Sequence, residues 1–206
     1  MTIVTIGLIA DGTSDRALIP LLKLLLKEHL LLPFEELQLI KGEQNDLASK
    51  VRYALDKFSL DILFIHRDTE NKPWEDREAE IRRAVPDDRL DLVVFVIPVK
   101  MTEAWLLTDA AAIRRAVGNS NSKVDLELPT IKKIESCSAK EVLFKALINA
   151  KEHGAQRRRT FKPDQYRYRV AELTSDLKSL RQIQSFKRLE DSLILCLTKL
   201  NYAHPL

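Results

Sequence analysis

The chain has 206 residues, 45% of them hydrophobic, which is enough for one sizeable core or for a domain of about 100 to 150 residues with an appendage. The formal net charge of +3 is mildly basic and does not by itself indicate a nucleic-acid partner. Cys137 and Cys196 match no metal-ligand spacing and are typical of reduced thiols in a cytoplasmic protein, and no segment is predicted to be a signal peptide or a membrane span.

Short apolar segments alternate with amphipathic ones along the first 117 residues. The apolar segments predict strands at residues 3–10, 37–40, 62–66 and 92–98. The amphipathic segments predict helices at about residues 15–31, 46–58, 74–85 and 102–117. Strands that alternate with helices predict a doubly wound α/β domain with a sheet of about four parallel strands.

The rest of the chain has a different pattern. Residues 118–129 are polar and predict a linker or a long loop. Beyond them the periodicity is helical only, at about residues 139–153, 165–183 and 185–200. We therefore expect an α/β domain at residues 1–117, and a linker with a helical C-terminal appendage packed on it at residues 118–206.

Acidic residues stand where the predicted strands end. Asp68 and Glu70 follow the third strand, Asp11 follows the first, and Glu103 opens the helix after the fourth. Side chains two apart in an extended segment point the same way, and two such carboxylates repel each other unless a cation or a shared proton lies between them. If the first, third and fourth strands are neighbours, these acids gather at one edge and suit Mg²⁺ or Mn²⁺. The alternative is that they cap helices and fill loops.

Segments 6–15, 64–70 and 97–109 resemble the TOPRIM superfamily, and most closely an uncharacterised TOPRIM-like bacterial family often encoded beside ATPases in defence or mobile loci. The resemblance covers about residues 1–117 well and the tail loosely. The superfamily has a Glu-Gly turn after its first strand and an Asp-x-Asp pair after its third. The resemblance places Asp11 at the Glu position, where it implies proton transfer, and places Asp68 and Glu70 at the Mg²⁺-binding pair. Asp11 is one methylene shorter than the usual Glu, and Glu70 is one longer than the usual Asp.

A basic segment with interleaved tyrosines occupies residues 151–169. Arginine and lysine grip a phosphate backbone, and tyrosines stack on bases, so the segment is a candidate nucleic-acid surface. Its candidate binding residues are Arg157, Arg158, Arg159, Lys162 and Arg167. The alternative interpretation is a solvated loop followed by the start of a helix.

Three functional hypotheses follow. The first is a Mg²⁺-dependent TOPRIM-like nuclease in which Asp68 and Glu70 hold the metal, and Asp11 or Glu103 completes the shell or moves a proton. The second is a non-catalytic accessory protein that binds a partner ATPase or nucleic acid. The third is a receiver-like phosphoacceptor at Asp68, which the sequence disfavours because only one acid follows the first strand and a fifth strand is missing.

Overall fold

The computed structural model describes residues 2–41, 46–152, 160–175 and 177–203. The chain divides into two compact units. The sheet unit comprises residues 1–15, 25–97 and 188–206, and the helical unit comprises residues 16–24 and 98–187. This division differs from the expected boundary after residue 117, because residues 98–117 belong to the helical unit and residues 188–206 belong to the sheet unit.

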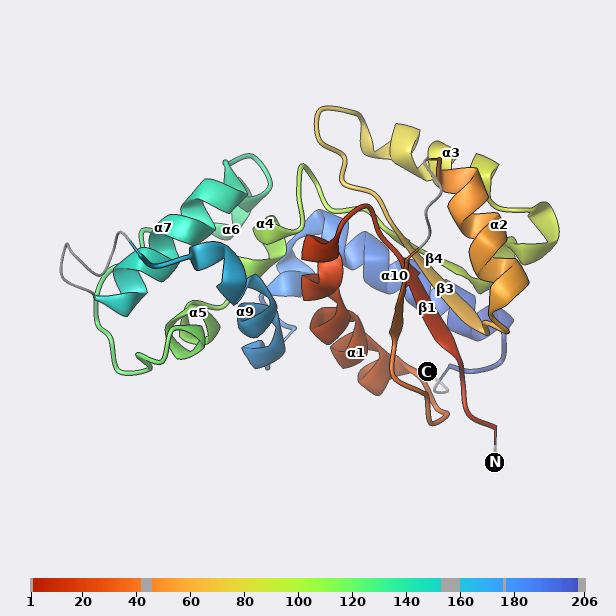
Figure 1. The fold of residues 1–206 in the computed structure, drawn as a ribbon, viewed down its shortest axis with the longest axis horizontal. Helices are drawn as coiled ribbons and strands as arrows, with labels where there is room; N and C mark the ends of the chain where they lie inside the picture. The colour runs from red at the N-terminus through yellow and green to blue at the C-terminus, as the bar shows by residue number, and fades with distance from the viewer. Residues whose placement is uncertain (1, 42–45, 153–159, 176, 204–206) are drawn as a thin grey trace. The chain divides into compact units, whose positions relative to one another are not determined.

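The sheet has four parallel strands in the order β2-β1-β3-β4 (Figure 1). The strands are β1 (Ile6–Ile9), β2 (Gln38–Ile40), β3 (Ile62–His66) and β4 (Val93–Val96). Phe64 in β3 pairs with Leu8 in β1 and with Val94 in β4. All residues of β1 and β3 are buried, as expected for central parallel strands covered on both faces. The predicted α/β class and the parallel sheet are confirmed.

Two helices cover one face of this sheet. They are α2 (Leu47–Lys57) and α3 (Trp74–Ala84), which contact each other (Figure 1). The core between them and the strands includes Val51, Leu63 and Ile81. The Asp46 side chain caps α2 by accepting a hydrogen bond from the Ser49 amide at 2.9 Å, as the sequence predicts.

Parts of two further helices complete the sheet unit. They are residues 25–29 of α1 (Leu18–His29) and residues 188–199 of α10 (Gln184–Lys199). The Phe95 amide in β4 donates to Ser192 Oγ in α10 at 3.1 Å. A 3₁₀ turn, η1 (Thr13–Ala17), precedes α1, and Pro20 falls in the first turn of α1, where proline is tolerated.

The helical unit consists of short helices joined by irregular segments. They are α4 (Glu103–Leu106), α5 (Ala110–Ala116), α6 (Ile131–Ile134), α7 (Ala139–Lys151), η3 (Pro163–Tyr166), α9 (Arg167–Leu173) and η4 (Leu180–Gln182). The single helix predicted at 102–117 is wrong, because Asp109 caps a new helix by accepting from the Ala112 amide at 2.8 Å. The single helix predicted at 165–183 is also wrong, because Thr174 adopts an extended backbone after α9.

Trp105 in α4 lies in the core of the helical unit. Its side chain is only 1% exposed, and its ring meets that of Phe186 edge-on at 5.3 Å. Its Nε1–H donates to Ser185 Oγ at 2.9 Å, so the one polar atom of the indole is satisfied. Trp105 is therefore a packing residue. In the described part of the chain, no helix combines the length and apolar character needed to cross a membrane.

Candidate functional site

The carboxyl ends of β1 and β3 lie next to each other, because these two strands are hydrogen-bonded neighbours. From β1 the chain continues to β2 on one side of β1, whereas β3 and β4 lie on the other side of β1. This makes the edge between β1 and β3 the topological switch point, where open α/β sheets bind their ligands. Asp11 follows β1 by two residues, and Asp68 and Glu70 follow β3 by two and four. We call this region the carboxyl edge.

Asp11 is held by two cationic side chains. Nη1 of Arg67 lies 2.6 Å from its Oδ1 and 2.7 Å from its Oδ2, and Lys50 Nζ lies 3.7 Å from Oδ1. The Asp11 side chain is still 46% exposed. The carboxylate is thus neutralised by the chain itself, yet remains open to solvent.

Glu80 in α3 forms ion pairs with both Arg67 and Arg77 at the carboxyl edge. Arg67 Nη2 lies 2.8 Å from Glu80 Oε1, and Arg77 Nη1 lies 2.7 Å from Glu80 Oε2. Burial acts to raise the pKa of Glu80, but these two guanidinium groups outweigh it and hold the pKa below its ordinary value. Glu80 therefore stays ionised and fixes both arginines.

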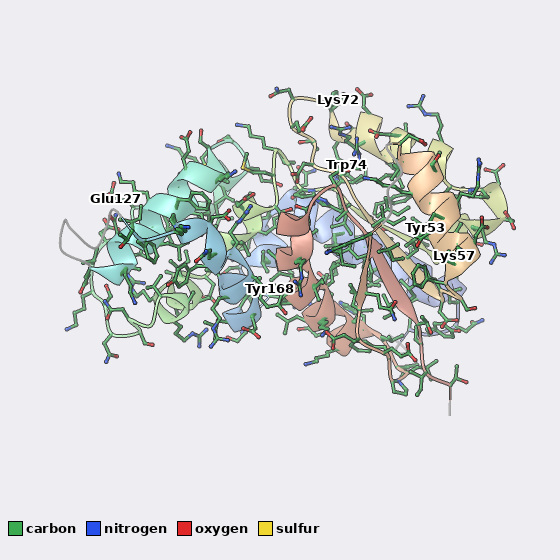
Figure 2. The ribbon with its side chains drawn as sticks, in the orientation of Figure 1. Tyr53, Lys57, Lys72, Trp74, Glu127 and Tyr168 are labelled. Atoms are coloured by element: carbon green, nitrogen blue, oxygen red, sulfur yellow. The ribbon has the colours of Figure 1, made fainter. Side chains whose placement is uncertain are left out.

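Arg77 also fixes the loop after β3. Its Nε donates to the Asp68 carbonyl at 2.9 Å, and its Nη2 lies 3.1 Å from Glu70 Oε2. Glu70 has a left-handed backbone with φ of 53°, which is uncommon outside glycine, and its side chain is 70% exposed. Figure 2 shows Lys72 and Trp74 in the segment that follows, where the loop passes into α3.

His66, the last residue of β3, lies between two carboxylates. Its Nε2 is 3.1 Å from Asp68 Oδ1, and its Nδ1 is 3.5 Å from Asp15 Oδ2. Burial of the imidazole acts to lower its pKa, but hydrogen bonding and charge from Asp15 and Asp68 raise the pKa to about 9. Asp15 also accepts from the Gly12 amide at 2.9 Å, which ties the turn after β1 to the end of β3.

The predicted metal ligands are brought to one edge, but each is engaged by a cation. Arg67 and Lys50 engage Asp11, Arg77 engages Glu70, and His66 engages Asp68. Among the described residues, one group of three side chains has a potential ligand atom from each within 4.8 Å of the other two. Asp11, Asp68 and Glu70 do not belong to that group. The donor chemistry suits Mg²⁺, whereas ion binding requires the side chains to leave their present partners.

A cavity of about 240 Å³ opens beside Asp11, at the carboxyl ends of β1 and β2. Its lining combines apolar strand residues, the turn after β1 and two lysines. The lining residues are Ala10, Asp11, Gly12, Leu39, Ile40, Lys41 and Lys50. The lysines give this side of the carboxyl edge a positive lining that suits an anionic group.

Glu103 belongs to the helical unit and is 7% exposed. Arg167 Nη1 lies 2.7 Å from its Oε1, and Arg167 also pairs with Asp164. A residue predicted to be catalytic and a residue predicted to bind nucleic acid therefore neutralise each other.

The rest of the basic segment is described only in part. Arg157, Arg158 and Arg159 lie outside the described residues, and Lys162 is exposed. The Tyr168 ring, labelled in Figure 2, is exposed and has the Arg16 guanidinium 5.9 Å from its centre. The role of this segment in nucleic-acid binding stays a prediction.

Comparison of the chain with protein-family models, curated proteins and solved structures gives no match. The TOPRIM resemblance therefore depends on the residues quoted above.

Sequence patterns alone assign no role at the carboxyl edge to several residues that lie there. Arg77 is 4% exposed, and it stands on the buried face of α3 between Trp74 and Ile81, at helical spacings of three and four. A charged residue at a core-facing position needs a partner, so this pattern was a usable signal. The contact between Asp15 and His66 had no comparable signal, because it depends on the pairing of β1 with β3.

Proposed function

We propose that this chain is a TOPRIM-like protein whose carboxyl edge binds a divalent cation and cleaves phosphodiester bonds in nucleic acid. The observation that carries the proposal is the pairing of β1 with β3, because it puts Asp11, Asp68 and Glu70 after neighbouring strand ends. Such a switch-point edge is where parallel sheets bind ligands.

The present partners of these acids are compatible with ion binding. Asp11 and Glu70 are 46% and 70% exposed, so an ion in solvent can reach both carboxylates, although their partners Arg67 and Arg77 are largely buried. A divalent ion would compete with Arg67, Arg77 and His66 for these acids, and Arg77 would keep Glu80 and the Asp68 carbonyl as partners. Asp68 and Glu70 would hold Mg²⁺ or Mn²⁺, with Asp11 completing the set. When bound, the ion polarises a phosphate and lowers the pKa of its bound water.

The chain's own side chains then have defined tasks. Arg67, released from Asp11, donates its guanidinium hydrogens to phosphate oxygens. Lys50 and Lys41 line the adjacent cavity and neutralise a neighbouring phosphate. Where Asp11 does not serve as a ligand, it would accept a proton from the attacking water. Glu103, bound by Arg167 in the helical unit, is a further candidate for proton transfer, and that role stays a prediction.

The test is cleavage of single- and double-stranded DNA and RNA with Mg²⁺ or Mn²⁺, comparing the wild type with Asp68→Asn. The matched control is Asp88→Asn, which removes the same charge from an exposed residue elsewhere in the sheet unit. We expect cleavage by the wild type and Asp88→Asn, and only background cleavage by Asp68→Asn. Absence of cleavage by the wild type on every substrate refutes the proposal.

A second candidate is a non-catalytic accessory protein that binds a partner ATPase or nucleic acid. The contacts of Arg77 favour this candidate. Its buried guanidinium binds Glu70, Glu80 and the Asp68 carbonyl at once, which is typical of a hydrogen-bond network that stabilises the fold. Electron paramagnetic resonance of added Mn²⁺ separates the candidates. If the wild type binds no Mn²⁺ at the carboxyl edge, and Asp68→Asn binds nucleic acid like the wild type, the accessory role stands.

The receiver-like hypothesis has less support. A receiver-like sheet has five strands in the order 2-1-3-4-5. The observed order β2-β1-β3-β4 matches the first four, but the described residues contain no fifth strand.

A further inference from the structure

A second cluster of potential metal ligands lies in the sheet unit, outside the carboxyl edge. Glu28 and His29 are the last two residues of α1, and Glu190 lies in α10. One ligand atom from each of the three lies within 4.8 Å of the other two. The contact joins residues 161 apart in the chain, so it depends on tertiary packing rather than on local sequence.

Glu190 is the buried member of the cluster. It is 7% exposed, and its Oε1 lies 2.7 Å from His29 Nε2. A buried carboxylate is costly unless a positive charge compensates it. A metal ion bound by both side chains would supply such a charge.

The donor set indicates which ion fits. One imidazole nitrogen with two carboxylates is a mixed nitrogen and oxygen set, which Zn²⁺ and its transition-metal neighbours bind and Mg²⁺ does not prefer. Three protein ligands leave a fourth position for water. Glu28 is exposed, which gives an ion a path into the cluster from solvent.

We propose that Glu28, His29 and Glu190 form a Zn²⁺-type metal site that links the end of α1 to α10. His29 Nε2 and Glu190 Oε1 would each bind the ion, and Glu28 would be the third ligand. Because an ion at this site binds only the folded sheet unit, it stabilises that unit in proportion to the ion concentration. The site does not depend on the proposed nuclease function.

The experiment is titration of the chelator-treated full chain with Zn²⁺, and with Co²⁺ as a spectroscopic probe. We expect one equivalent to bind at this cluster with visible Co²⁺ absorption, apart from any ion at the carboxyl edge, and the unfolding temperature to rise with Zn²⁺. Glu190→Gln should weaken binding by more than the roughly 10- to 100-fold that loss of an outer-shell partner costs. Asp191→Asn, an exposed neighbour in α10, is the matched control and should bind like the wild type.

Three further variants keep the test decisive. Glu28→Gln changes an exposed residue and should leave the fold intact while weakening Co²⁺ binding, so it serves if Glu190→Gln does not fold. Asp68→Asn should remove only Co²⁺ absorption that comes from the carboxyl edge, and the absorption that remains belongs to the Glu28, His29 and Glu190 cluster. If the wild type binds neither Zn²⁺ nor Co²⁺, or if Glu28→Gln and His29→Gln both bind like the wild type, the cluster is not a metal site and the proposal is wrong.

Discussion

Arg167 Nη1 lies 2.7 Å from Glu103 Oε1, and both side chains are largely buried in the helical unit. The sequence suggests separate tasks for them, catalysis for Glu103 and nucleic-acid binding for Arg167. Their pairing means that a substitution at either position first disturbs the fold of the helical unit. A loss of function in these variants has to be separated from a loss of stability.

Arg167→Met should lower the free energy of unfolding by about 3 kcal/mol, because it leaves the buried Glu103 carboxylate without its partner. Urea denaturation measures the change. Arg169→Met is the control, since its pair with Glu172 is exposed and should be worth about 0.5 kcal/mol or less. Adding Glu103→Gln to Arg167→Met should recover most of the loss. Equal destabilisation by the two arginine variants would contradict the prediction.

His66 should make stability depend on pH. The pKa of His66 is about 9 in the folded chain against an ordinary 6.5, so the folded state binds the proton more tightly. Its stabilisation is complete below pH 6.5 and is lost as the pH rises through about 9. In chelator, the wild type should lose stability over this range relative to His66→Gln, which lacks the titrating group facing Asp15 and Asp68. Parallel stability curves for the two proteins would show that His66 is not protonated there.

Arg67→Met should tighten Mn²⁺ binding at the carboxyl edge, because it frees Asp11 from its closest cation. Electron paramagnetic resonance of Mn²⁺ measures the affinity. Arg82→Met removes an equivalent guanidinium from α3, where it pairs with Glu78, and should leave Mn²⁺ affinity unchanged. Weaker Mn²⁺ binding by Arg67→Met would mean that the arginine organises the acids rather than competing for them.

Ser185→Ala should destabilise the helical unit by about 1–3 kcal/mol, because the buried indole N–H of Trp105 loses its acceptor. Trp105→Phe removes the donor as well as part of the ring. In the Trp105→Phe background, Ser185→Ala should therefore cost much less. Chemical denaturation of the four proteins in this cycle gives the coupling energy. Full additivity would show that the hydrogen bond contributes nothing.

The sheet was predictable from sequence because its strands are short apolar runs, and residues 62–66 were predicted with the observed bounds. The adjacency of β1 and β3 was needed for the site hypothesis, and the observed strand order supplies it. The helices of the second unit were less predictable, because Asp109 and Thr174 interrupt patterns whose apolar spacing continues through them.

The pairing of the site acids was not predictable to the same degree. The acids of the carboxyl edge were visible as residues after strands, but the partner of each is chosen by packing. Arg67 reaches Asp11 across 56 positions and His29 reaches Glu190 across 161, and neither distance in sequence leaves a local pattern. The repulsion argument for Asp68 and Glu70 required a compensating cation without identifying it, and side chains of the chain itself reach both acids, since Arg77 engages Glu70 and His66 engages Asp68.

The sheet unit draws on both ends of the chain, since residues 188–206 belong to it together with residues 1–15 and 25–97. During synthesis, β4 emerges from the ribosome long before Ser192, whose hydroxyl receives the Phe95 amide. One side of the nascent sheet therefore remains incompletely covered while about 90 intervening residues are translated. Contacts so distant in sequence are slow to form, which makes this stage of biogenesis the point where a chaperone has the most to protect.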